Sequence, residues 1–433
     1  MKVQQKAPLQ SACRAKKMAG RCLLGKGRRA ALGGRYARRK WEWNTICSAD
    51  FGCALCALAF ALTALPTAAF AQQPEEQAAV QQSLSATDVR EMQQADAAVT
   101  ALTGGSDYAQ MTEDERTDAA LQQLDALTAQ GLVKQGSVYT DAENGMISFT
   151  YSCGALGGIL LTDPDEENTA ALQELDESQL QELAENKRVG TAAIYYAFDN
   201  TINSTRYPYY AYMQTYWDSV GLQTDLDTTV TVSDLRRMGR YDLCILSTHG
   251  AYYTYEYGWL FKKTATEPLI LLTERSDFWS DLRYGFDLLA HRVVKVNGMY
   301  AVNGDFFRSA YRGNGIVLSE TCEFYGKNGH VDTSMADGLL AGGAKAVMGY
   351  VNNVYSVYSR SMLWAAVNRM IEGETLEQAV DYAKSIYGTD DIIWYNEQGG
   401  RRSHAAASYA MLSGDRSAAL PNPYTAADVD AAA

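Results

Sequence analysis

The chain has 433 residues, enough for one large domain or roughly two to three smaller ones. Its net charge is −13, yet residues 1–71 hold 13 Lys and Arg and only two acids, which leaves 25 basic and 49 acidic residues in the remainder. So acidic a body argues against nucleic acid as a partner, because phosphate binding needs a basic surface. It is typical of a solvated, secreted protein.

The N-terminus has the order of a secretory signal. A basic segment, 1–50, precedes an apolar run, 51–66, and small residues follow at Ala69 and Ala71. We therefore expect 1–71 to be a removed signal region, which implies a secreted or cell-surface protein without stable membrane insertion. A retained membrane anchor is the alternative, although the apolar run is short for a spanning helix.

Cysteine usage points to one reactive thiol. Five of the eight cysteines lie in the signal region, and Cys153, Cys244 and Cys322 remain. An odd number this small is not a disulfide framework. Cys244 is predicted to be a buried strand residue and Cys153 a turn residue, free or paired, whereas Cys322 follows a strand in a reactive context.

Residues 72–188 are expected to be an accessory or pro-segment. Residues 72–110 are typical of a flexible leader or a loose helix. A helix is predicted over 112–129, because Thr112 and Glu115 can form a capping box.

Short strands are predicted within 137–162, with a turn at 141–145. The acidic residues 163–188 are interpreted as a solvated linker and helix, since they lack the glycine and spacing of a calcium loop.

From residue 189 strands alternate with helices, which predicts a doubly wound, mostly parallel α/β sheet flanked by helices. This domain is expected to end at 416, before a C-terminal tail, 417–433. The predicted strands are 191–198, 229–232, 241–247, 315–319, 345–350 and 407–412. The predicted helices are 209–220, 233–238, 334–341, 356–372 and 375–386.

A long insertion, 251–304, interrupts this pattern. It begins with a tyrosine-rich run and ends with a β-hairpin over 293–302, whose Asn297-Gly298 pair suits a two-residue turn. Such a loop is expected either to form a cleft wall or lid, or to pack its aromatic side chains on the domain.

Two strands of this domain end in reactive side chains. His249 follows strand 241–247, and Cys322 follows strand 315–319. Because catalytic groups gather at the carboxyl ends of parallel strands, the pair can act as thiolate and imidazole. The Gly250 N–H could serve an oxyanion. The alternative is an ordinary strand-end histidine and a half-buried cysteine.

Five ordered segments across 190–416 together resemble the caspase-like superfamily of cysteine peptidases, which includes caspases, legumain, gingipains, clostripain-type enzymes and bacterial CHAT domains. Arg416 stands where members often have Pro. The segments are 194–200, 241–250, 315–322, 335–349 and 409–415.

The resemblance implies a secreted bacterial cysteine endopeptidase of caspase-like fold, with His249 as base and Cys322 as nucleophile. The backbone N–H groups of Gly250 and Cys322 would form the oxyanion site. Glu320 would line the pocket for the residue before the scissile bond and favour Arg or Lys there. A structural hydrogen bond to the backbone is the other interpretation of Glu320, and Asp199 is a second candidate for the cleft.

No cofactor or metal is expected, although the resemblance allows calcium without assigning a site. The third catalytic group stays open between Asp199 and Asn200. The expected partner is a protein or peptide substrate, and latency until cleavage near 189 is a hypothesis for the pro-segment. The alternatives are a non-catalytic caspase-like surface binding domain and a cysteine acyltransferase or effector on the same fold.

Overall fold

The computed structural model describes residues 83–161, 187–198, 209–258, 262–328, 330–391, 408–425 and 428. The predicted signal region, nearly all of the acidic segment, Asp199, Asn200 and His404 lie outside these ranges. Among the residues within them, no helix has the length and apolar character needed to cross a membrane.

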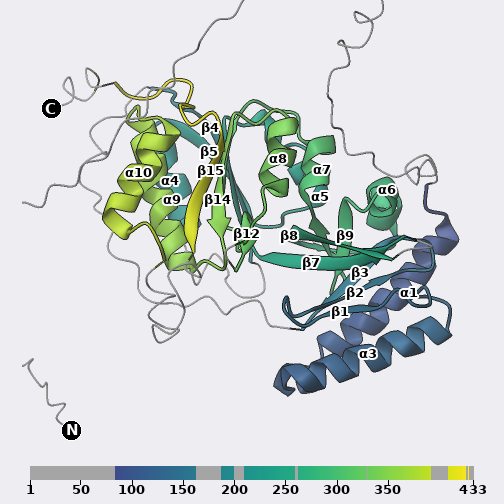
Figure 1. Ribbon diagram of the computed structural model, residues 1–433. Coiled ribbons are helices and arrows are strands. Elements are labelled where there is room, and N and C mark those ends of the chain that lie inside the picture. Colours follow the sequence, from purple (N-terminus) through teal and green to yellow (C-terminus); the bar gives the residue numbers. More distant parts are fainter. Residues whose placement is uncertain are drawn as a thin grey trace, which may run out of the picture. The chain divides into compact units, whose positions relative to one another are not determined.

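A six-stranded sheet forms the centre of the domain predicted from residue 189 (Figure 1). Its spatial order is β5-β4-β6-β11-β14-β15, and every neighbouring pair is parallel except β14 with β15. The prediction of a mostly parallel α/β sheet flanked by helices is confirmed. The strands are β4 (Gly190–Ala197), β5 (Leu222–Asp227), β6 (Leu243–Thr248), β11 (Ile316–Ser319), β14 (Ala346–Val351) and β15 (Tyr409–Gly414).

Helices cover both faces of this sheet. On one face α4, α9 and α10 pack through residues such as Trp217 and Met362, and on the other α5, α7 and α8 pack through residues such as Phe306. Because both faces are covered, β6 and β14 are buried along their whole length and appear in the sequence as continuous apolar runs. The helices are α4 (Tyr209–Ser219), α5 (Val232–Leu235), η2 (Met238–Arg240), α7 (Gly304–Ala310), α8 (Ser334–Ala341), α9 (Ser356–Ile371) and α10 (Leu376–Tyr387).

One predicted strand is wrong. Residues 229–232 lead into α5, where Thr231 and Asp234 form a capping box, so the cap prevails over the strand propensity of this β-branched run. The strand is instead β5, which alternates buried and exposed residues. This strand was not predicted because it contains the polar residues Gln223 and Asp225. An edge strand tolerates such exposed polar side chains.

A second sheet of seven strands joins the N-terminal segment to the insertion. Its order is β1-β2-β3-β9-β10-β8-β7, with β3 and β9 parallel and the other pairs antiparallel. The two regions, far apart in the sequence, therefore share one sheet. Its strands are β1 (Tyr139–Asp141), β2 (Met146–Thr150), β3 (Leu156–Leu160), β7 (Gly250–Tyr257), β8 (Lys263–Arg275), β9 (Val293–Val296) and β10 (Met299–Val302), and a two-stranded ribbon pairs β12 (Gly326–Lys327) with β13 (His330–Val331).

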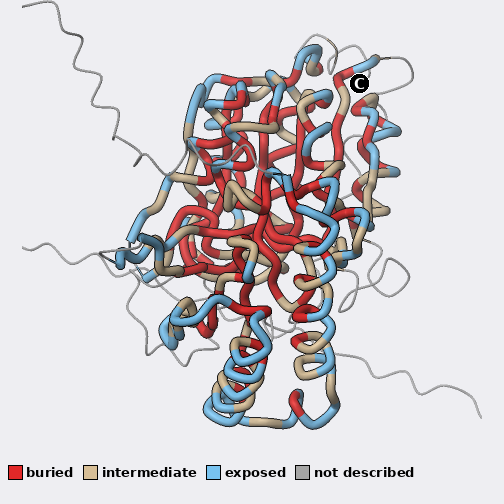
Figure 2. Tube along the Cα trace, turned by 90° about the vertical axis from the view of Figure 1, so that its right-hand side faces the viewer, coloured by how far each residue is buried: buried red, intermediate tan, exposed pale blue. Residues whose placement is uncertain are grey.

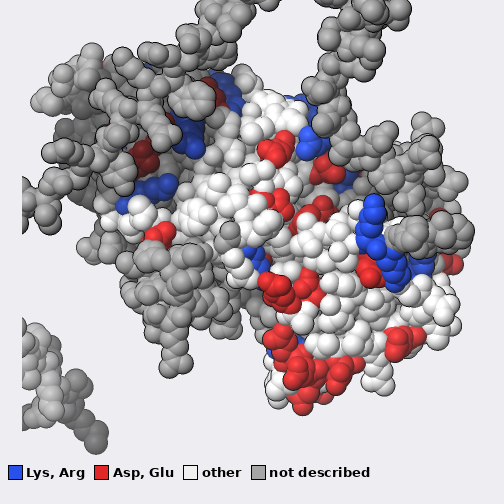
Figure 3. All heavy atoms as spheres, viewed as in Figure 1, with Lys and Arg blue, Asp and Glu red and all other residues white. Residues whose placement is uncertain are grey.

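The described part of the expected leader is helical. Helix α1 (Ala86–Thr103) begins at a capping box of Ser85 and Asp88 and buries Val89 and Met92. Helix α3 (Glu113–Ala129) begins at Thr112, whose predicted capping box with Glu115 is confirmed. Figure 2 shows the buried strands at the centre and the exposed residues on outer helical turns, and Figure 3 shows acidic side chains gathered where α3 lies. The remaining helices of this layer are α2 (Ser106–Gln110) and α6 (Phe278–Leu289).

The insertion is mainly sheet. Its predicted hairpin is confirmed as β9 and β10, and Asn297 and Gly298 both have positive φ, 49° and 74°, as a tight hairpin turn needs. In the tyrosine-rich run, which is β7, Tyr252 and Tyr253 are buried. The packing interpretation of these aromatic side chains therefore holds for this pair.

Candidate active site

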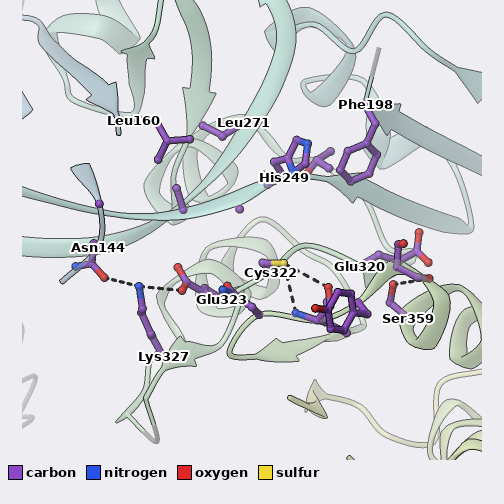
Figure 4. Close-up of a pocket in the computed structure, with 18 of the residues that line it drawn as sticks. Asn144, Leu160, Phe198, His249, Leu271, Glu320, Cys322, Glu323, Lys327 and Ser359 are labelled. Atoms are coloured by element: carbon purple, nitrogen blue, oxygen red, sulfur yellow. Dashed lines mark hydrogen bonds and ion pairs between the residues drawn. The ribbon is translucent and has the colours of Figure 1, made fainter. Parts of the chain in front are cut away.

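The carboxyl ends of β4, β6 and β11 meet at a cleft of about 370 Å³. Strand order reverses at β4, since β5 flanks it on one side and β6 on the other, and ligands bind at such switch points in open α/β sheets. Phe198, His249 and Cys322 reach this cleft from the three strand ends (Figure 4). The two stretches that the sequence paired are thus brought together.

His249 lies at the junction of β6 and β7. Its ring contacts the Phe198 ring edge-to-face, with centroids 4.4 Å apart. Burial lowers the pKa of this imidazole from 6.5 to about 4. At neutral pH the ring is therefore uncharged, which is the form that can accept a proton.

Cys322 lies just beyond the end of β11. Two residues before it, the Glu320 N–H still pairs with β6 by donating to the Leu246 carbonyl oxygen at 2.8 Å. The Val354 N–H donates to Sγ at 3.4 Å, and the thiol donates to the Val354 carbonyl oxygen at 3.6 Å. These bonds fix the sulfur in the cleft wall, and the N–H would stabilise negative charge on it.

A pair of hydroxyl groups connects the two strand ends that carry His249 and Cys322. Thr248 Oγ1 and Thr321 Oγ1 are 3.0 Å apart, and both side chains are buried. Because each threonine directly precedes one of the two candidate residues, this bond fixes the spacing of β6 and β11 at the point where His249 and Cys322 emerge.

Close packing against Cys322 explains why residue 250 is glycine. A Cβ at Gly250 would lie 2.0 Å from the Cys322 carbonyl oxygen and 2.5 Å from Thr321 Cγ2. The Leu271 N–H donates to the His249 carbonyl oxygen at 3.0 Å, so Gly250 and Ile270 are a non-hydrogen-bonded pair of the β7–β8 ladder. The Gly250 N–H therefore points away from β8.

Glu320 lines the same cleft and is only 6% exposed. Its Oε2 accepts a hydrogen bond from the Tyr210 hydroxyl at 2.8 Å, and Tyr210 accepts one from Ser247 Oγ at 2.7 Å. The Glu320 side chain is thus held by a phenol of α4. The sequence placed Tyr210 in the predicted helix 209–220 but did not single it out.

The other described thiols and histidines are elsewhere. Cys244 is fully buried in β6, where its thiol donates to the Met238 carbonyl oxygen at 3.1 Å and burial raises its pKa. Burial also raises the pKa of the half-buried Cys153 thiol. His291 hydrogen-bonds the Gly154 carbonyl oxygen at 3.1 Å, and His330 is exposed in β13. Cys322 and His249 are thus the thiol and imidazole in the cleft.

The N-terminal segment also lines the cleft, which the sequence did not predict. Residues 142–145, in the turn between β1 and β2, and Leu160 of β3 face it, together with Glu323 and Lys327. From the insertion the wall contains Ala251 and Leu271 but none of the β7 tyrosines. Across the described ranges no group of three His, Cys, Asp or Glu side chains could hold a metal ion.

Comparisons with known proteins assign no family. No protein-family model and no curated protein matches the chain. Among solved structures, one similar chain belongs to the separase–securin complex of Saccharomyces cerevisiae, at 10% sequence identity and a TM-score of 0.29. The match covers 52% of this chain and 12% of that one, far less than two thirds of its length.

Proposed function

We propose that the protein is a cysteine endopeptidase of caspase-like fold, with Cys322 as nucleophile and His249 as general base. The observation that carries the proposal is that both side chains line one cleft at the switch point of a parallel sheet. The resemblance of the flanking segments to caspase-like peptidases supports the same roles.

The neutral imidazole sets the order of proton transfers. His249 accepts the thiol proton as Sγ attacks the peptide carbonyl carbon, whose electron pair moves onto oxygen. When the carbonyl re-forms, the C–N bond breaks and the protonated imidazole gives its proton to the leaving amine. His249 then deprotonates a water that hydrolyses the thioester and restores Cys322.

The backbone at Gly250 and Cys322 is proposed to stabilise the oxyanion. Support comes from the Gly250 N–H, which points away from β8, and from the close approach of Gly250 to the Cys322 backbone. Fixed N–H donors of this kind stabilise the negative oxygen of a tetrahedral intermediate without reorganising.

Glu320 is proposed to select a basic residue before the scissile bond. Its carboxylate is buried at the cleft and held by Tyr210. An Arg or Lys side chain that enters the cleft would form a charge-assisted hydrogen bond with it, whereas an acidic one would be repelled.

A fluorogenic peptide panel that varies this residue tests the proposal. We expect cleavage after Arg and Lys, and none with Cys322→Ala or His249→Ala. Activity that survives Cys322→Ala would refute the nucleophile, and a preference for Asp or Asn would refute the role of Glu320. If transfer of the acyl group to an added amine exceeds hydrolysis, the result would favour an acyltransferase. If the peptides bind without turnover, the result would favour a non-catalytic binding domain.

Export is part of the proposal. The basic segment, the apolar run and the small residues at Ala69 and Ala71 support a removed signal region. N-terminal sequencing of the mature protein should give Gln72 as the first residue. A mature chain that still contains the apolar run 51–66 would instead indicate a membrane anchor.

A further inference from the structure

The N-terminal segment and the insertion are joined within one sheet. Strand β3 pairs with β9 through Gly157 with Lys295 and Gly158 with Val296. The fully buried Tyr253 of β7 donates its hydroxyl to the Gly157 carbonyl oxygen at 2.9 Å. Removing the N-terminal segment would expose the edge of β9 and leave this hydroxyl without its acceptor.

A buried group of charges connects the same regions. The Lys295 side chain of β9 has no exposed surface and forms ion pairs with Asp96 of α1 and, at 2.8 Å, with Asp281 of α6. Tyr151 and Tyr300 donate their hydroxyls to these two carboxylates. Without α1 a buried ammonium would lose one of its two carboxylates, which is costly in a low-dielectric interior.

The N-terminal segment also holds the loop that follows the nucleophile. Lys327 Nζ donates to the Glu143 carbonyl oxygen at 3.3 Å and to Asn144 Oδ1 at 3.1 Å, and it pairs with Glu323 Oε1 at 3.1 Å. Figure 4 shows Lys327 between Asn144 and Glu323, the residue directly after Cys322. Glu323 has a φ of 56°, and its N–H donates to the Asn352 carbonyl oxygen at 2.8 Å.

We propose that residues 83–161 are a permanent part of the catalytic body, and that Lys327 is the positioning residue through which they hold the loop of Cys322. This inference rests on the proposed function, because the proposed function makes Cys322, in that loop, the nucleophile. Two roles were considered for the segment, an accessory part and a pro-segment. The inference favours the first, because the segment forms a wall of the cleft and is not a removable inhibitor.

The first experiment severs the chain. A recognition site for a sequence-specific protease is placed between residues 163 and 186, and the cut protein is passed over a size-exclusion column. We expect the fragments to elute together, with kcat/KM within about twofold of the uncut protein. Separation of the N-terminal fragment from a folded, more active remainder would overturn the proposal.

The second experiment breaks the contact. Lys327→Met and Asn144→Ala should each lower kcat, on the order of tenfold for Lys327→Met, with little change in KM, and Lys327→Arg should restore most of it. The loss of kcat in the double variant should be smaller than the two single losses combined, because both substitutions remove the same interaction. Lys134→Met, an exposed lysine outside the cleft, is the matched control.

A readout without turnover separates this inference from the proposed function. The rate at which iodoacetamide alkylates Cys322, followed by peptide mass spectrometry, should change severalfold in Lys327→Met and Asn144→Ala but not in Lys134→Met. If no peptide is cleaved while these rates change, only the peptidase proposal fails. Unchanged alkylation in both variants would refute the role of Lys327.

Discussion

The low pKa of His249 is the residue-scale property with the clearest kinetic consequence. Burial places this pKa at about 4, so the imidazole is in its basic form at every pH well above that value. We expect kcat/KM to rise as pH increases through about 4 and then to stay level toward neutrality. A pH series from 3 to 8, with intrinsic fluorescence as a control for folding, measures this. An acid limb near 6.5 would show that the ring is solvated or charge-paired during catalysis.

Glu267 of β8 should make the protein less stable in alkaline solution. Burial raises the pKa of its carboxyl from 4.5 to about 7, although Asn303 Nδ2 donates to it at 3.0 Å. Because the folded state holds the proton more tightly, stability falls as pH rises from 4.5 through 7, by about 3 kcal/mol.

Glu267→Gln should therefore raise Tm at pH 8 and leave it nearly unchanged at pH 5. The exposed Asp118 of α3 provides the control, since Asp118→Asn should show no such pH dependence. Equal effects of Glu267→Gln at both pH values would contradict the raised pKa.

The sequence predicted the strand-end residues of the site but not their supporting contacts. His249 and Cys322 were recognised because each follows a continuous apolar run, whereas Glu320 was implied by the resemblance to caspase-like peptidases. Tyr210 and Lys327 carry no such signal, because their roles depend on groups more than 100 residues away. Asp199 stays a prediction, outside the described residues.

At the scale of an element, α4 matters because it delivers Tyr210 to the cleft. Tyr210→Phe removes the hydroxyl that donates to Glu320 and leaves Ser247 without its acceptor. The carboxylate is then less firmly oriented, so we expect KM for Arg peptides to rise roughly tenfold, the value of one charge-assisted hydrogen bond. Steady-state kinetics on Arg and Ala peptides measures the change.

Tyr216→Phe is the matched control for this helix, because Tyr216 packs its ring 4.8 Å from the Trp364 ring on the same face. It should leave both peptides unaffected. Loss of activity on Arg and Ala peptides alike after Tyr210→Phe would indicate a packing role instead of an effect through Glu320.

Elements with a strong local signal were predicted well, and elements defined by their neighbours were not. Helix α8 begins and ends where the sequence placed it, and the β9–β10 hairpin has the predicted turn. Strand β5 was missed because pairing with β4, rather than an apolar pattern, makes it a strand. Helix α1 is held mainly by its packing, which composition alone does not reveal.

At the scale of the whole molecule, the pairing of β3 with β9 could not be predicted, since neither strand contains a local signal for a partner so distant in sequence. The same holds for the buried ammonium of Lys295, which looks in the sequence like an exposed strand residue. Its ion pairs with Asp96 of α1 and Asp281 of α6 connect the N-terminal segment to the insertion, so we expect the second sheet and α1 to unfold as one cooperative body.

Lys295→Met tests that cooperation. Removing the ammonium leaves Asp96 and Asp281 as two buried carboxylates without their counter-ion, so we expect the free energy of unfolding to fall by about 3 kcal/mol. Hydrogen exchange should accelerate at the amides of α1 and β3 together, because both lose the contact that connects them through β9. Lys345→Met, at an exposed lysine, should change neither quantity. Faster exchange in α1 alone would mean that the helix is attached independently of the sheet and that the N-terminal segment could leave without disturbing the cleft.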